Sequence, residues 1–190
     1  MKKVAVNEFQ EIISNPINLG PKDQMIVEYT DLPEVIDELS VSLRLKLKTH
    51  SSNWATIFHK GSGTTQRTPS LWLTANKSSL HPRCSGNWAS DAGLTDIGDG
   101  LLLNRWYHIT YTLSDPLKRM DFYINGEWKG FYCVQKPQEQ RVIFNDGPLH
   151  IGRAFNTDGF NGEISNFRYF NWRLSPEEVI KNVSNQEPFS

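Results

Sequence analysis

The chain has little cysteine, little unbalanced charge and no long apolar run. Its 190 residues include only two cysteines, Cys84 and Cys133, and their spacing matches no metal-binding or redox motif. Its 20 Lys and Arg residues and 21 Asp and Glu residues leave a net charge of −1, whereas a nucleic-acid-binding surface needs a basic excess. No stretch approaches the roughly 18 apolar residues of a membrane span. We therefore expect neither nucleic-acid binding nor membrane insertion.

The N-terminal residues also lack the pattern of a secretory signal. Residues 1–8 contain two lysines, but no apolar run follows them. Without such a signal, Cys84 and Cys133 are expected to be free thiols in a reducing compartment. The sequence thus predicts a cytoplasmic protein.

What the chain does contain is alternation of apolar and polar residues, with 12% aromatic residues. In residues 40–48, four apolar residues fall on one face of an extended chain and Ser, Arg and Lys on the other, which is typical of a strand with one solvated face. Asn125 and Gly126 separate two such runs and predict a hairpin turn. Further strands are expected at 54–59, 70–75, 106–113, 120–124, 127–132, 148–152 and 163–170. Eight to twelve strands predict an all-β, antiparallel two-sheet sandwich of the jelly-roll type.

One short helix is expected near the C-terminal end. Ser175 can cap it, Pro176 suits its first position, and Glu178 completes a capping box. A helical turn is also expected after Pro33, within residues 31–39. We expect the jelly-roll domain to span residues 26–184, with an N-terminal extension over 1–25 that adds a strand and a tail over 185–190.

Four segments, in this order, resemble a known family. They are Trp106–Thr112, Asp121–Gly126, Leu149–Arg153 and Phe160–Val179, the last of which runs into the Leu-Ser-Pro-Glu-Glu helix start. Together they are similar to laminin G-like domains of the concanavalin A-like lectin/glucanase superfamily, over roughly residues 39–181. The resemblance implies a concanavalin A-like jelly roll, but it implies no particular ligand.

Catalytic motifs are missing from the sequence. Glycosidases of this superfamily carry two carboxylates on one strand, as in Glu-x-Asp-x-x-Glu, because acid and nucleophile must lie about 5 Å apart for retention. No such run occurs, and no Gly-x-Ser-x-Gly elbow is present. We therefore predict a protein that is not an enzyme and has no catalytic residues.

Calcium is the one cofactor that the resemblance raises, because laminin G-like relatives often bind it with loop oxygens. Ser165 stands where many members have a carboxylate, so no bound metal is expected. The weak calcium candidates are Asn156, Asp158 and Asn161 after the predicted 148–152 strand, and Asp91, Asp96 and Asp99 in a Gly-rich loop. Asn and Asp beside Gly are also ordinary turn formers.

Aromatic and basic residues on predicted strands are the candidate ligand-binding residues. If Leu71 and Leu73 face the core, Trp72 lies on the outer, concave side, where lectins of this fold often hold ligands. His81 and Arg83 alternate in the same way, and Trp54 and Trp88 lie in or beside Asn-rich segments. Such rings stack on sugars, and Trp and Arg also anchor protein partners. The alternative is that these residues fill a large two-sheet core.

The sequence therefore predicts a non-catalytic interaction module that packs against protein partners in a larger intracellular assembly. Intracellular proteins of this fold include cytoskeletal and ciliary components, so the resemblance raises such an assembly as one setting, although no residue of this chain points to it. The alternative is a carbohydrate-binding, lectin-like domain, and the third reading is a degenerate glycosidase.

Overall fold

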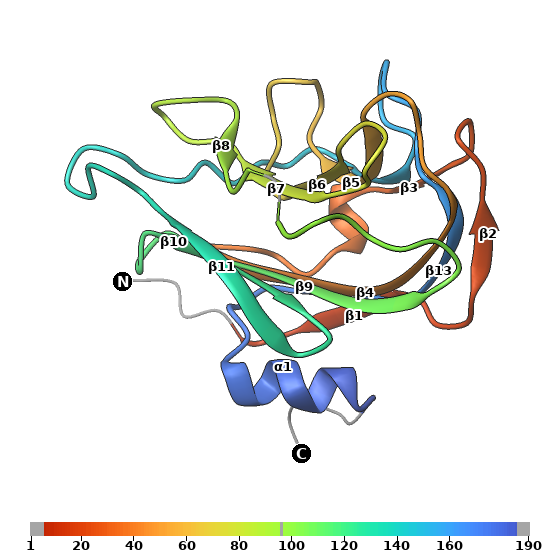
Figure 1. Cartoon of the computed structure of the whole chain (residues 1–190). Coiled ribbons are helices and arrows are strands. Elements are labelled where there is room, and N and C mark those ends of the chain that lie inside the picture. Colours follow the sequence, from red (N-terminus) through yellow and green to blue (C-terminus); the bar gives the residue numbers. More distant parts are fainter. Residues whose placement is uncertain (1–5, 96, 186–190) are drawn as a thin grey trace.

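Two antiparallel β-sheets lie face to face in the computed structural model (Figure 1), which describes residues 6–95 and 97–185. One sheet has seven strands and the other has six. The expected all-β jelly-roll sandwich is thus confirmed. Asp96 and residues 186–190 of the expected tail lie outside the described residues.

The seven-stranded sheet carries the longest strands. Its order is β1 (Phe9–Ile13), β13 (Asn161–Phe170), β4 (Glu38–Thr49), β9 (Trp106–Ser114), β10 (Arg119–Ile124) and β11 (Glu127–Cys133), and β2 (Ile17–Leu19) also pairs with β13. The six-stranded sheet has the order β3 (Gln24–Val27), β12 (Leu149–Gly152), β5 (Ala55–Lys60), β6 (Ser70–Leu73), β7 (Leu80–Cys84) and β8 (Ala92–Gly93).

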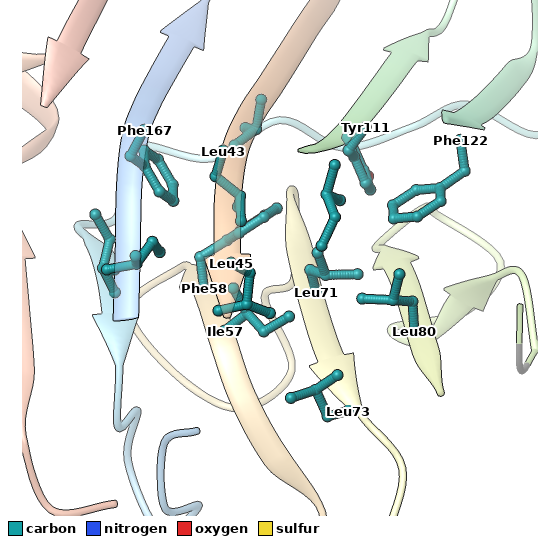
Figure 2. Packing of buried hydrophobic residues seen from close by; sticks show 14 of the residues in the cluster. Leu43, Leu45, Ile57, Phe58, Leu71, Leu73, Leu80, Tyr111, Phe122 and Phe167 are labelled. Carbon is teal, nitrogen blue, oxygen red and sulfur yellow. The ribbon is translucent and has the colours of Figure 1, made fainter. Parts of the chain in front are cut away.

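The hydrophobic core fills the space between the two sheets, because alternate residues of the strands point inward. The exception is the irregularity in β5, where the consecutive residues Ile57 and Phe58 both lie in the core. Figure 2 shows Leu43, Leu45, Tyr111, Phe122 and Phe167 of the seven-stranded sheet facing Ile57, Phe58, Leu71, Leu73 and Leu80 of the other, and each of these residues is at most 2% exposed. Full burial of a large apolar side chain contributes about 1.5–3 kcal/mol. The alternation read from the sequence is therefore the pattern that builds this core.

A short helix covers the outer face of the seven-stranded sheet. Helix α1 (Pro176–Val183) begins with the expected capping box: Glu178 N–H donates to Ser175 Oγ at 3.2 Å, and Ser175 N–H donates to Glu178 Oε2 at 2.7 Å. In Figure 1 the helix lies on the side of this sheet that faces away from the six-stranded sheet. A second apolar cluster joins them, made by Phe9, Tyr123, Phe170, Trp172, Leu174 and Val179.

Two expectations about the fold were wrong. No helical turn follows Pro33; the turn in this region is a 3-10 turn, η1 (Tyr29–Asp31), which precedes the proline. The Glu34 carbonyl accepts a hydrogen bond from Asn171 Nδ2 at 3.1 Å, so a distant side chain binds a carbonyl that a helical turn would use. The described residues contain thirteen strands, one more than the expected maximum, and β1, β2 and the first residues of β3 come from residues 1–25.

Among the described residues, no helix is long and apolar enough to cross a membrane.

Candidate functional site

A row of aromatic rings and imidazoles runs across the outer face of the six-stranded sheet. Leu71 and Leu73 of β6 are buried in the core, so Trp72 between them points to the outer face, as expected. Trp72 lies directly across from His81 of β7, whose neighbours Leu80 and Pro82 face inward. The strand alternation thus places Trp72 and His81 side by side on one surface.

Trp54, which immediately precedes β5, contacts both of these side chains. Its ring lies edge-on to Trp72, with the ring centroids 6.3 Å apart, and edge-on to His81 at 4.8 Å. The indole remains 42% exposed. We call Trp54, Trp72 and His81 the aromatic triad. Such ring contacts fix the orientation of an exposed indole before any partner arrives.

Beyond the aromatic triad, the row of rings continues with side chains that are more buried. His59 of β5 lies 6.3 Å from Trp72 and 5.2 Å from Phe155, measured between ring centroids. Arg67 leans over the Trp72 ring at 5.1 Å. Sequence reasoning missed Arg67 and Phe155, because both lie in loops and reach this face only through the tertiary fold.

Arg83 belongs to an ion network at one side of the triad. Its Nε lies 2.6 Å from Asp91 Oδ1, and Arg67 Nη1 lies 3.0 Å from the same oxygen. Partial burial opposes ionisation of Asp91, but the two guanidinium groups outweigh that effect and lower its pKa. Two cations share one carboxylate here, which leaves a net positive charge beside the aromatic triad.

Trp88, the remaining expected ligand residue, is separate from the triad. It lies in the loop between β7 and β8, where its ring is partly buried, packs against the main core and covers Gly86. For Trp88 the structure therefore supports the alternative reading, in which the ring contributes to packing.

A polar pocket opens beside Trp54. Its volume is about 360 Å³, and the indole shares its lining with Lys22, Ser51, Asn53, Asn156, Thr157 and Asp158. A second pocket of about 240 Å³ adjoins it and includes Asn161. We call the first of these the Trp54 pocket. It combines one exposed ring with amide, hydroxyl, carboxylate and ammonium groups.

The calcium candidates are only partly brought together. Asn156 and Asp158 line the Trp54 pocket, whereas Asp91 belongs to the arginine network. The Asp158 carboxylate accepts a hydrogen bond from Lys22 Nζ at 2.7 Å, and Asn161 Nδ2 donates to Thr49 Oγ1 at 3.0 Å. No group of three or more His, Cys, Asp or Glu residues in the described chain could hold a metal ion. An ammonium group on Asp158 competes directly with a cation.

One serine and one histidine touch on this face without forming a catalytic pair. Ser70 Oγ lies 3.4 Å from His59 Nδ1, but it also accepts the indole N–H of Trp72, and both Ser70 and His59 are at most 1% exposed. Burial lowers the pKa of His59 to about 4. A base this weak and this inaccessible does not suit proton abstraction near neutral pH. The contact fits a structural hydrogen bond.

Fold and site together define a jelly-roll domain with an aromatic surface. A family model described as the concanavalin A-like lectin/glucanases superfamily matches residues 20–180. The chain belongs to this superfamily, as the resemblance had implied. No curated protein matches it significantly.

Solved structures with the same fold are distant in sequence. The receptor-binding domain of botulinum neurotoxin D is 21% identical, with a TM-score of 0.71 over 94% of this chain and 48% of that one. A SAP-like pentraxin from Limulus polyphemus is 21% identical, with a TM-score of 0.58 over 80% of this chain and 72% of that one. A sialidase from Trypanosoma rangeli, solved with the inhibitor DANA, is 17% identical, with a TM-score of 0.56 over 77% of this chain and 22% of that one.

The chain therefore spans about half the length of the toxin domains that it matches. At these identities the likeness shows the fold alone. The neighbours are thus a receptor-binding domain, a pentraxin and a sialidase.

Proposed function

We propose that this domain is a non-catalytic binding module that holds a protein partner on the outer face of the six-stranded sheet. The observation that carries the proposal is the exposed indole of Trp54, fixed edge-on against Trp72 and His81. A rigid aromatic anchor of this kind is typical of the residues that dominate protein interfaces.

The surroundings of the triad indicate the chemistry of the partner. Arg67 and Arg83 share the single carboxylate of Asp91, so a positive charge remains next to an apolar ring. We expect a partner that presents an apolar or aromatic side chain beside an acidic group. Charge pairs of this kind raise the association rate and fix the orientation of the partner.

The two cysteines fit the expected intracellular setting. Cys84 is buried on β7 and Cys133 lies on β11 of the other sheet, and both are free thiols. Buried thiols persist in reducing compartments. Placement in a larger cytoplasmic assembly, cytoskeletal or ciliary, is part of the proposal.

Isolation of the native complex with matched variants tests the proposed function. The wild-type domain should retain a partner at fixed stoichiometry in the presence of EGTA and free sugar. Trp54→Ala should lose the partner, since truncation of an interface anchor costs about 2 kcal/mol or more. Trp128→Ala is the matched control, because Trp128 is 50% exposed on the other sheet. Equal retention by both variants would contradict the proposal.

A second candidate function is glycan binding in the Trp54 pocket. The specific observation in its favour is the pocket of about 360 Å³ in which one exposed indole adjoins Asn53, Asn156 and Asp158. A ring for the apolar face of a sugar, with polar groups around it, is the usual composition of such a site. Saturable binding on a glycan array that is lost in Trp54→Ala and kept in Trp128→Ala would favour this function over the first.

A further inference from the structure

Lys60 occupies an inward-facing strand position where an apolar residue is expected. On β5, His59 points to the outer face, whereas Phe58 on one side of it faces the core. Lys60 lies directly across from Leu149, which is completely buried in the core. The lysine is only 3% exposed. Moving an ammonium group out of water is costly, so its position requires an explanation.

The partners that Lys60 contacts are neutral. Its Nζ donates to the backbone carbonyl and to the side-chain oxygen of Asn145, and it lies 5.1 Å from the centre of the Tyr29 ring. Asn145 in turn donates to the Lys60 carbonyl at 3.2 Å and to the Thr68 carbonyl at 3.3 Å. Burial lowers the pKa of Lys60 to about 8, and the nearby Asp146 only partly opposes this effect. The positive charge is therefore incompletely balanced.

A cavity of about 410 Å³ opens at this lysine. Residues of both sheets line it, Leu39 and Tyr169 on one and Lys60 on the other, together with the segments that contain Tyr29 and Asn145. The lining is mixed: it includes apolar and aromatic residues such as Val35 and Phe144 and polar residues such as Gln66 and Thr68. The volume falls in the range of small-molecule sites, which is about 300–1,000 Å³.

We propose that this cavity binds a small organic carboxylate. The carboxylate group would lie against the Lys60 ammonium, and the apolar body would pack against Tyr29, Val35 and Phe144. The Asp146 carboxylate lines the same cavity, so a dianion such as a phosphate monoester would be repelled more strongly than a monoanion. This site is distinct from the aromatic triad and does not depend on the proposed partner.

Calorimetric titration with a matched pair of probes tests the proposal. We choose 3-phenylpropionate and its neutral amide, 3-phenylpropionamide, which differ chiefly in charge. The acid should bind at least about tenfold more tightly than the amide at pH 7. Its affinity should fall between about pH 7 and pH 9.5, because Lys60 loses its proton in that interval. Equal affinity for acid and amide, or absence of acid binding at millimolar concentration, would overturn the proposal.

Two lysine variants locate the effect. Lys60→Met keeps most of the length of the side chain and removes the charge, so it should lose the preference for the acid. Lys129→Met, on the edge strand β11, is the control and should retain the preference. Thermal melting checks that both variants fold. If Lys60→Met does not fold, the pKa of Lys60 is instead measured by NMR in the wild-type chain. This pKa should rise when 3-phenylpropionate is added. An unchanged Lys60 pKa in the presence of bound acid would also overturn the proposal.

Discussion

Two buried histidines make the stability of the domain depend on pH. Burial favours the neutral imidazole and lowers the pKa of His59 and of His108 from 6.5 to about 4. Nearby cationic groups lower both values further: His150 and Arg67 act on His59, and Arg44 and Arg168 act on His108. The unfolded chain therefore takes up protons on both residues at a pH where the folded chain does not. The free energy of unfolding should fall as the pH drops from about 6.5 toward 4, by at most about 2 kcal/mol per histidine at pH 5.

Urea denaturation at several pH values measures this slope. The double variant His59→Gln, His108→Gln should show a flatter dependence between about pH 6.5 and pH 5 than the wild type. A wild-type stability that stays constant across this interval would contradict the assignment of both histidines as buried and neutral.

The fold also depends on the negative charge of Asp121. Its carboxylate is almost completely buried and accepts hydrogen bonds from Arg119 at 2.6 and 2.8 Å, from Arg173 at 3.0 Å and from Trp128 at 3.0 Å. Burial opposes ionisation, but these donors outweigh it and lower the pKa of Asp121. Asp121→Asn should reduce the free energy of unfolding by about 2 kcal/mol, because two guanidinium groups lose their counter-charge. Asp99→Asn, at an exposed loop position, should change it little; equal effects of the two variants in urea denaturation would contradict this account.

The contact between Lys22 and Asp158 leads to a prediction about calcium. Because the Asp158 carboxylate already accepts a bond from an ammonium group, millimolar Ca²⁺ should shift the Tm by less than about 1 °C. Differential scanning calorimetry with Ca²⁺ and with EGTA measures the shift. A tight site would raise the Tm by several degrees in excess Ca²⁺, and that result would contradict the prediction.

The sequence was enough to predict which face of a strand a site residue lies on. It was not enough to predict which other side chains that residue contacts. Alternation with Leu71 and Leu73 was enough to place Trp72 on an outer face. The contact between Trp72 and Trp54 depends on the pairing of β5 with β6, which a single sequence does not reveal. Lys60 was missed because it precedes a Gly-Ser-Gly turn, so its inward direction became visible only from the register with β12.

At the scale of elements, helix α1 owes part of its stability to its first residue. Ser175→Ala removes the Oγ that accepts the Glu178 N–H, and it should lower the free energy of unfolding by about 1 kcal/mol. Ser90→Ala, at an exposed loop position, is the control and should have little effect. Chemical denaturation of both variants measures the difference; no loss in Ser175→Ala would show that the cap contributes nothing to stability.

Elements with local signals were predictable, and elements decided by distant contacts were not. The turn between β10 and β11 is an example of a local signal, because Asn125 and Gly126 adopt φ values of 53° and 80° that few other residues tolerate. The segment after Pro33 is the opposite case. Its composition permits a helical turn, but the Glu34 carbonyl instead accepts a hydrogen bond from Asn171, which is 137 residues further along the chain.

The edge strand β11 shows how one side of the sandwich is protected. Lys129 forms an irregularity between the paired residues Trp128 and Gly130, which disrupts the regular pairing with β10. Bulges and lysines on edge strands discourage pairing with another chain. We therefore expect partners to approach a face of the molecule and not this edge.

At the scale of the whole molecule, the two outer faces differ. Helix α1 covers part of the seven-stranded sheet, and its buried Asn182 donates to Ser42 Oγ and accepts from Arg168 at 2.7 Å, so this helix is firmly attached. The outer face of the six-stranded sheet instead carries the aromatic triad and the Trp54 pocket. We therefore expect a partner to bind the second face. The asymmetry itself follows from long-range pairing that no local pattern predicts.

Oxidative footprinting of the isolated complex reveals which sheet the partner covers. Trp54 and Trp128 are the reporters, since they are 42% and 50% exposed on opposite sheets of the free domain. If the partner lies on the aromatic triad, hydroxyl-radical oxidation of Trp54 should fall in the complex while that of Trp128 stays at its value in the free domain. Protection of Trp128 with undiminished oxidation of Trp54 would place the partner on the other sheet and contradict the account.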